Sequence, residues 1–330
     1  MTWRVLDIAK AAVRRLEQNV SSAASYSLMN HLQFVDFAER ALLLQGRALS
    51  NNLRETPRVR NLGDVEFRVF SQWGEDGIID WLVDQIALPN HRFVEFGVEN
   101  FREANCRFLM QNRNWRGLVF DGSTENMKAL RSERMFWMHD LTATTAFITA
   151  DNINGLIEAA GFGGPLGILS IDIDGNDYWV WKAIDCVQPA IVICEYNAVL
   201  GDRFALTIPY APDFQRLNAH PSGQYFGASI LALRQLGEEK GYDLVGTNTN
   251  GVNAFFVRKD LAGQVLSRMD EVRAFPSRHR DSRDETGALT FVGGRKRIEL
   301  IADMPVVDLS TGNTVRLGQL DQPYSADWQD

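Results

Sequence analysis

Residues 92–121 read RFVEFGVENFREANCRFLMQNRNWRGLVFD, and the order of apolar and polar segments in this stretch indicates the fold. Arg92–Phe96 is a short apolar strand that runs into Gly97, and Gly117–Asp121 is a second strand that ends in an acid. Between them, Asn105–Asn112 has the length of a helix. A strand, a helix and a second strand in this order predict part of a doubly wound α/β sheet.

The same alternation continues along the chain. Apolar segments predict three further strands, at Arg134–Met138, Leu166–Asp172 and Ala190–Glu195. Tyr242–Gly246 and Asn253–Val257 are joined by the turn residues TNTNGV and predict an antiparallel hairpin at the sheet edge. Five parallel strands followed by a terminal hairpin form the strand plan of Rossmann-like class I methyltransferases. We therefore expect an α/β fold with a mostly parallel sheet and a terminal antiparallel hairpin.

The predicted sheet lies within a longer chain. Residues 1–60 have helical apolar spacing and predict a helical extension, which serves as an oligomerisation arm for a homo-oligomer or as a cap. Residues 61–260 form the predicted methyltransferase domain, and residues 261–330 a C-terminal extension. In that extension, residues 267–283 are charge-rich and predict a solvated loop, and residues 305–313 predict a small hairpin.

Composition limits the function classes. The net charge of -8 argues against a nucleic-acid partner, which needs a basic face. Cys106, Cys186 and Cys194 form no CxxC pair, as expected for free thiols in a reducing compartment. The N-terminus lacks the apolar core of a signal peptide, and no segment has the length of a membrane span. We therefore expect a cytoplasmic protein.

The loop after the first predicted strand is a candidate cofactor site, because ligands of open α/β sheets bind at the carboxyl ends of strands. Gly97 lets the backbone approach a ligand closely. The chain has no GxGxxG motif here, which a pyrophosphate needs, whereas S-adenosylmethionine carries no phosphate. The acid Glu95 suits its cationic sulfonium. We therefore expect S-adenosylmethionine as cofactor, in contact with Glu95, Gly97 and Asn100.

Other segments extend this site. An acid about 20 residues beyond the glycine turn typically binds ribose hydroxyls, and Asp121 fits, followed by Gly122 and Ser123. Helix capping is the alternative for Asp121 and Ser123. His139 and Asp140 follow the third predicted strand, where adenine binds, although a surface turn is as good an explanation. Gln72 lies in a segment, residues 71–77, that either folds over the cofactor or caps a helix.

Acids are most concentrated at the end of the fourth predicted strand, where residues 172–177 read DIDGND. Asp172 and Asp174 point the same way from an extended segment, and Glu195 and Asn197 follow the neighbouring strand. These four residues are candidate ligands for Mg²⁺ or Mn²⁺. The alternative is a metal-free site in which Asp172 is the general base. In the long loop 201–229, His220 is a further candidate base, or a surface histidine.

The motifs together resemble a known family. SQWGEDGII, FVEFGVENF, LVFDGS, SIDIDGNDYWVW and ICEYN, in this order, are similar to motifs of FkbM-type methyltransferases over about residues 68–260. The resemblance implies O-methylation of sugars and natural products, with Glu95, Gly97 and Asp121 at the cofactor and Asp172 at the methyl-transfer centre. The chain departs from the family pattern at Asp121–Ser123, where Glu-Pro is frequent, and at Asp174–Asp177, where Glu-Gly-x-Glu is frequent.

We therefore expect an S-adenosylmethionine-dependent O-methyltransferase whose acceptor is a hydroxyl of a glycan or of a glycosylated natural product. Two alternatives belong to other classes. A nucleotide-sugar or NAD-using enzyme is disfavoured by the missing GxGxxG motif and by the terminal hairpin. A catalytically inactive member that acts as a binding or assembly module is disfavoured by the acids at the strand ends.

Overall fold

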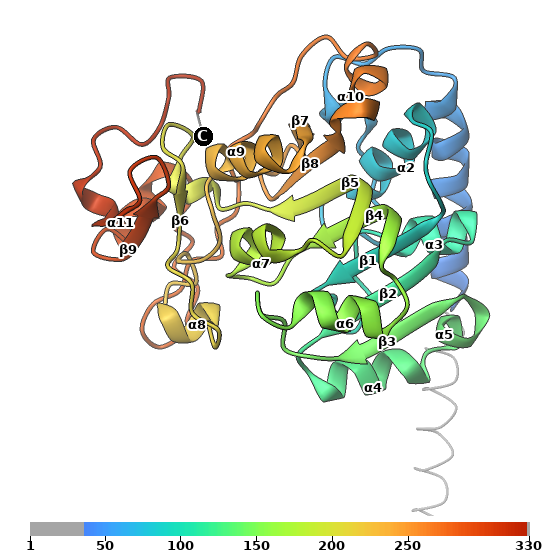
Figure 1. Ribbon diagram of the computed structural model, residues 1–330, viewed down its shortest axis with the longest axis horizontal. Coiled ribbons are helices and arrows are strands. Elements are labelled where there is room, and N and C mark those ends of the chain that lie inside the picture. Colours follow the sequence, from blue (N-terminus) through green and yellow to red (C-terminus); the bar gives the residue numbers. More distant parts are fainter. Residues whose placement is uncertain (1–35, 329–330) are drawn as a thin grey trace, which may run out of the picture. The chain divides into compact units, whose positions relative to one another are not determined.

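A computed structural model describes residues 36–328 of the chain (Figure 1). The chain divides into two compact units, Met1–Ala48 and Leu49–Asp330, and each is considered by itself. Residues 36–54 are helical, as the apolar spacing predicted, and Phe37 and Leu44 are exposed there. The rest of the predicted oligomerisation arm, residues 1–35, lies outside the described residues.

A seven-stranded sheet forms the centre of the second unit, in the order β3-β2-β1-β4-β5-β8-β7. Its strands are β1 (Arg92–Phe96), β2 (Arg116–Asp121), β3 (Leu141–Thr145), β4 (Gly164–Ile171), β5 (Val187–Glu195), β7 (Tyr242–Thr247) and β8 (Asn253–Arg258). The first five are parallel, and β8 runs antiparallel to both β5 and β7. This order confirms the predicted Rossmann-like class I methyltransferase sheet with its terminal hairpin. The strand order reverses between β1 and β4, which makes their carboxyl ends the switch point.

One predicted strand is wrong. Residues 134–138 form the short helix α5 (Arg134–Met138), and the third strand begins at Leu141. His139 and Asp140 therefore precede β3 and lie at the amino edge of the sheet, where the Asp140 carbonyl accepts a hydrogen bond from Gly117 N–H. The Asp140 carboxylate also lies 3.4 Å from Arg116 Nε. The sequence RMFWM is apolar without alternation, and such a short run does not distinguish a strand from a helix.

Helices cover both faces of the sheet because its strands are apolar on both sides. Ile191 and Ile193 of β5 pack in one core with α2 (Glu75–Gln85), α3 (Arg107–Arg113), α4 (Thr124–Ser132) and α10 (Lys259–Leu266). Val192 and Cys194 alternate with them and pack in a second core with α6 (Ile153–Ala159), α7 (Asp177–Ala183) and α9 (Ile230–Lys240). Short 3-10 turns occur at Leu62–Val65, Ala198–Leu200, Gly294–Lys296 and Leu317–Gln319.

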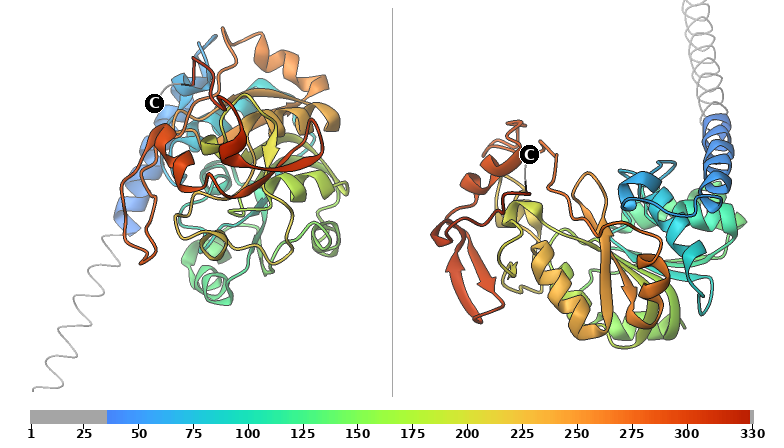
Figure 2. Two further views of the ribbon diagram at one scale, coloured as in Figure 1. Left: turned by 90° about the vertical axis from the view of Figure 1, so that its left-hand side faces the viewer. Right: turned by 90° about the horizontal axis from the view of Figure 1, so that it is seen from above.

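The C-terminal segment packs against the long loop between β5 and α9. In that loop, β6 (Leu206–Thr207) and α8 (Arg216–Ala219) are short, and β6 pairs with β9 (Pro305–Asp308). β9 and β10 (Asn313–Arg316) form the predicted small hairpin. Figure 2 shows β9 and α11 (Arg297–Leu300), both in red, beside the yellow β6 segment. Residues 270–281, predicted as a solvated loop, cross the β7–β8 hairpin, with Thr247 N–H donating to Arg273 and Arg278 N–H donating to Asn250.

A search of residues 36–328 for membrane-spanning helices finds none with the necessary length and apolar character.

Gly97 fixes how closely β1 approaches β4 at the switch point. Its φ is +69°, and a Cβ built there would lie 1.6 Å from the carbonyl oxygen of Asp172. The Gly97 N–H donates to the Phe120 carbonyl, so the turn is held from both neighbouring strands. The sequence predicted that Gly97 allows a ligand to approach the backbone. The structure shows that a glycine is needed here because the backbone at Asp172 passes so close to it.

We expect Gly97→Ala to lower the free energy of unfolding by about 3 kcal/mol, because the new Cβ meets a backbone atom and the positive φ disfavours an L residue. Gly155→Ala is the control. Gly155 lies in α6 with no atom within 4 Å of its built Cβ, so alanine there should stabilise the protein by about 0.5–1 kcal/mol. Urea unfolding measures both, and equal stability of the two variants would contradict this account of Gly97.

Candidate active site

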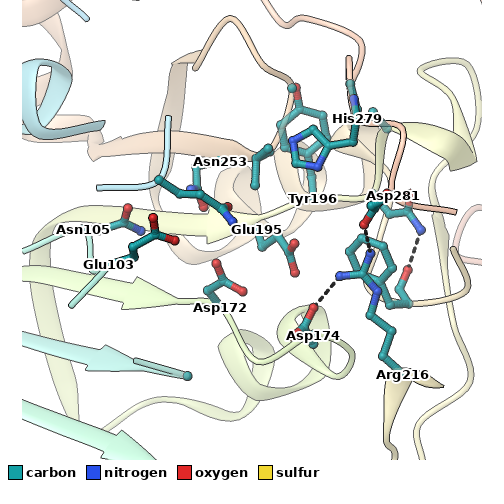
Figure 3. A pocket seen from close by; sticks show the side chains of 18 of the residues that line it. Glu103, Asn105, Asp172, Asp174, Glu195, Tyr196, Arg216, Asn253, His279 and Asp281 are labelled. Carbon is teal, nitrogen blue, oxygen red and sulfur yellow. Dashed lines mark hydrogen bonds and ion pairs between the residues drawn. The ribbon is translucent and has the colours of Figure 1, made fainter. Parts of the chain in front are cut away.

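A cavity of about 250 Å³ opens at the carboxyl ends of β1, β4 and β5 (Figure 3). Glu95, Asp172 and Glu195 line it from these strand ends. Loops that are distant in sequence complete its wall, with Gln72, Arg216, Asn253, His279 and Asp281. The cavity therefore lies where an open α/β sheet binds its ligand.

The loop after β4 is held in shape by its own last acid. Asp177 accepts hydrogen bonds from Ile173 N–H at 2.8 Å and from Gly175 N–H at 2.9 Å, and it begins α7. Asp174 has a φ of +55°, and its carboxylate turns outward to Arg216 at a distance of 2.6 Å. Asp174 is thus paired with a guanidinium and does not converge on Asp172, contrary to the predicted ligand set.

Asp172 and Glu195 do come together. The register of β4 and β5 pairs Ile171 with Cys194, so each acid follows its strand at the same level. Ligand atoms of Asp172, Asp177 and Glu195 all lie within 4.8 Å of one another. Loss of solvation raises the pKa of both Asp172 and Glu195, and repulsion from the neighbouring carboxylates raises each pKa further. The two groups therefore share either a proton or a cation at neutral pH.

Asn197, the predicted amide ligand, is engaged by the backbone. It donates from Nδ2 to the carbonyls of Gln224 and Phe226, and its Oδ1 accepts from Val199 N–H. Its side chain therefore holds the loop after β5. Asn253 instead lies across from Glu195 in the β5–β8 ladder. No local pattern indicated Asn253, because antiparallel pairing over so many residues is not encoded locally.

Glu95 differs from its predicted role. It is 3% exposed and accepts hydrogen bonds from Asn105 N–H at 2.6 Å and Cys106 N–H at 3.0 Å. These bonds hold the start of α3, so both carboxylate oxygens are already occupied. Burial raises the pKa of Glu95 to about 7 in spite of the two donors. Glu95 therefore shapes the wall of the cavity more than it presents a charge to a ligand.

The segment 71–77 caps a helix and also reaches the cavity, the two alternatives that the sequence left open. Asp76 accepts hydrogen bonds from the N–H groups of Val69, Phe70 and Ser71, which is the capping function. Glu75 accepts from Trp73 and Gly74 N–H with one oxygen. Its other oxygen accepts from the Nδ2 groups of Asn248 and Asn253 in the β7–β8 hairpin. These acids hold the loop that brings Gln72 to the cavity.

Asp121 organises the neighbouring strand end. Its carboxylate accepts from Glu99 N–H at 2.9 Å and from Ser123 N–H at 2.8 Å. Ser123 in turn caps α4 by accepting from Asn126 N–H, and Asn100 Oδ1 accepts from Arg102 N–H. Asp121 is half-buried and lies next to the cavity, without lining it. Gly122, Ser123 and Asn100 are likewise outside the described lining residues.

A histidine does line the cavity, but it is not His220. His220 Nδ1 lies 2.8 Å from Ser222 Oγ, and His220 is absent from the described residues that line the cavity. His279, from the segment predicted as a solvated loop, lines it and packs on Trp73 with ring centroids 4.7 Å apart. The charge-rich sequence SRHRDSR concealed this residue, because such runs usually lie on the surface.

Arg216 joins the two sides of the cavity. Its guanidinium contacts Asp174 at 2.6 Å and Asp281 at 3.3 Å, and it lies 3.9 Å from the centre of the Phe226 ring. Figure 3 shows this arginine between the β4 loop and the C-terminal segment. The contacts fix the C-terminal segment, and with it His279, against the end of the sheet.

The cavity wall carries an excess of negative charge. Among the described residues, seven carboxyl groups and two guanidinium groups line it, so the acids still outnumber the bases when Glu95 and one acid of the Asp172–Glu195 pair carry a proton. Such a wall repels a pyrophosphate and favours a cationic ligand. The acids are Glu95, Glu99, Glu103, Asp172, Asp174, Glu195 and Asp281, and the bases are Arg216 and Arg297.

Comparisons with known proteins find only distant structural likenesses. No family model matches the chain, and no curated protein matches its sequence. Among solved structures, an O-methyltransferase from Bacillus cereus in complex with SAH is 15% identical, with a TM-score of 0.34, over 51% of this chain and 72% of that protein. The N-terminal domain of EvdMO1 with SAH bound is 12% identical, with a TM-score of 0.36, over 64% of this chain and 94% of that one. Likenesses this distant carry no argument about activity.

The raised pKa of Glu95 predicts a pH-dependent stability. In the folded protein this pKa is about 7, above the unfolded value of about 4.3, so the stabilisation present at low pH is lost as pH rises through 7. From pH 5 to pH 8 the free energy of unfolding of the native protein should fall by about 2 kcal/mol more than that of Glu95→Gln. Urea unfolding at several pH values measures this difference, and parallel pH profiles would contradict the raised pKa.

Proposed function

We propose that this chain is an S-adenosylmethionine-dependent O-methyltransferase, related to the FkbM-type enzymes that its motifs resemble. The observation that supports this most is the negatively charged cavity at the switch point of a class I methyltransferase sheet. S-adenosylmethionine is a cation with no phosphate, whereas NAD and nucleotide sugars bring a pyrophosphate to this position. The charge of the wall therefore favours the first cofactor over the others.

The residues present fit this cofactor. Asp121, half-buried at the end of β2, is the acid for the ribose hydroxyls. Its Oδ1 already accepts from Ser123 N–H and Asn126 Nδ2, whereas its Oδ2 accepts only from Glu99 N–H and has a lone pair left for the ribose. Gln72 and the turn at Gly97 line the adjoining part of the cavity and would hold the methionine portion. When bound, the cofactor supplies a methyl group activated by its sulfonium charge.

A polyhydroxyl acceptor suits the side of the cavity that Asn253 and His279 line. His279 Nε2 is buried there, with no hydrogen-bond partner within residues 36–328. Buried polar groups are normally paired, so this atom indicates a ligand that brings a hydroxyl group. Gln224 and Phe226 line the same side and offer polar and aromatic contacts. We therefore propose a sugar hydroxyl, in a glycan or a glycosylated natural product, as the acceptor.

His279 is placed to take the acceptor proton. Burial lowers its pKa; Arg297 and Arg216 lower it further, while Asp281 and Glu75 raise it. The neutral imidazole has a free lone pair on Nε2 when Nδ1 carries the hydrogen. As the acceptor oxygen bonds to the methyl carbon, its proton would pass to Nε2 and the sulfonium would become a neutral thioether. This function replaces the one predicted for His220, and Asp172 is the alternative base.

Calorimetry with S-adenosylhomocysteine tests the cofactor site. Asp121→Asn should weaken binding by about tenfold to a hundredfold, because a charge-assisted contact to the ribose is lost. Asp140→Asn is the matched control at the amino edge of the sheet, paired with Arg116, and should bind with unchanged affinity. Equal affinity of the two variants would remove the ribose assignment, and no binding by the native protein would refute the proposed function.

Methyl transfer tests the base. The assay follows release of S-adenosylhomocysteine with the best acceptor from a panel of glycosides. His279→Asn should lower kcat by about a hundredfold or more and leave S-adenosylhomocysteine affinity unchanged. His220→Asn, the matched histidine outside the cavity, should keep near-native turnover. Equal losses in the two variants would contradict the assignment to His279. If cofactor binds but no glycoside is methylated, the sugar assignment fails, and an inactive binding module becomes the better hypothesis.

A further inference from the structure

We propose that Asn253, oriented by Glu75, completes a divalent-cation site with Asp172 and Glu195. The inference deepens the proposed function by assigning the ligands that would hold a cation beside the acceptor, and it depends on that function only for what the cation does. It departs from the predicted ligands Asp174 and Asn197, both of which the structure commits to other contacts.

The sheet register places the ligands. Glu195 and Asn253 are direct partners in the antiparallel β5–β8 ladder, so their side chains project from the same face about 5 Å apart. Asp172 follows β4 on the other side of β5, with a carboxylate oxygen within 4.8 Å of one from Glu195. Figure 3 shows Asp172, Glu195 and Asn253 around the same cavity, on the ends of adjacent strands. Strands therefore hold Glu195 and Asn253, and Asp172 is the first residue after the end of β4.

Glu75 decides which atom Asn253 presents. A carboxylate only accepts hydrogen bonds, so the amide Nδ2 must face Glu75 Oε1, at 3.1 Å. The carbonyl Oδ1 is thereby turned away from Glu75. Asn253 is 3% exposed, and its Oδ1 has no hydrogen-bond partner within the described part of the chain. Asn248 also donates to Glu75 Oε1, at 2.7 Å, and its own Oδ1 accepts from the N–H groups of Val252 and Asn253, which fixes the turn.

The chemistry of the facing atoms favours a hard cation. Glu195 Oε2 and Asn253 Oδ1 are unpaired acceptors, and Asp172 adds a carboxylate. The nearest guanidinium, that of Arg216, is engaged by Asp174 and Asp281. Carboxylate and amide oxygens are ligands for Mg²⁺ or Mn²⁺ and not for soft metals. Asp177 is close enough to assist, and its two oxygens also hold the loop by accepting from Ile173 and Gly175 N–H. A cation here would polarise the acceptor hydroxyl.

Titration of the full-length protein with Mn²⁺ alone, followed by the electron paramagnetic resonance signal of the free ion, tests the site. The native protein should bind one Mn²⁺ saturably. Asn253→Ala and Glu195→Gln should each weaken binding by about tenfold or more, and Asn253→Asp should bind at least as tightly as the native protein. Asp140→Asn, which neutralises an acid at the amino edge of the sheet, is the control and should stay within about threefold. Asp174→Asn tests the alternative ligand and should lose less affinity than Asn253→Ala. Circular dichroism checks that each variant is folded.

The function of Glu75 as a positioning residue has its own test. Glu75→Gln should weaken Mn²⁺ binding in the native background, because Asn253 is then free to turn its Nδ2 toward the cavity. In the Asn253→Asp background the same change should not weaken binding, since a carboxylate has an oxygen on each side. A merely structural contribution would weaken binding in both backgrounds.

Three results would overturn the proposal: no saturable Mn²⁺ binding by the native protein, native affinity in Asn253→Ala, or a larger loss in Asp174→Asn than in Asn253→Ala. Calorimetry with S-adenosylhomocysteine separates this outcome from failure of the proposed function. Cofactor binding without Mn²⁺ binding would refute the cation site alone, and Mn²⁺ binding without cofactor binding would refute the methyltransferase alone.

Discussion

Asp172 and Glu195 face each other at the carboxyl edge of the sheet, and two ionised carboxylates so close together repel strongly when poorly solvated. The register of β4 and β5 creates this pair, and β8 sets Asn253 beside it. Arg216 compensates the pair only in part, because its guanidinium also contacts Asp174 and Asp281, and the pKa of both acids stays raised. A shared proton or a bound cation supplies the rest of the compensation, and this constraint underlies the proposed cation site.

The other acids of the site mainly organise backbone. Asp76, Glu95, Asp121 and Asp177 each accept hydrogen bonds from two or more backbone N–H groups of the loops around the cavity. A carboxylate that accepts several N–H bonds fixes a loop more firmly than a neutral side chain would. The acids at the strand ends thus have two functions. Those that accept several backbone N–H bonds shape the loops, whereas Glu195 keeps an oxygen without a hydrogen-bond partner in the described residues.

The C-terminal segment adds side chains to the cavity of the Rossmann-like core. Residues 270–281 cross the β7–β8 hairpin and bring His279 and Asp281 to the cavity, where Arg216 holds Asp281. β9 then pairs with β6 in the long loop after β5. This side of the cavity is therefore built from the loop after β5 and from the C-terminal segment, which are joined by Arg216 and Asp281, 65 positions apart in the chain.

The sequence by itself determined the sheet. Alternation of apolar strands and helices predicted β1, β2, β4 and β5, and the turn residues between β7 and β8 predicted the hairpin, because these patterns are local. It also placed Asp172 and Glu195 together, since carboxyl ends of neighbouring parallel strands meet at one edge. Only the tertiary structure decided that Asn253 lies across from Glu195, that His279 and not His220 lines the cavity, and that Asp174 turns to Arg216. The physical reason is that a side chain's partners depend on cross-strand register and on segments far away in the chain, which no local pattern of residues records.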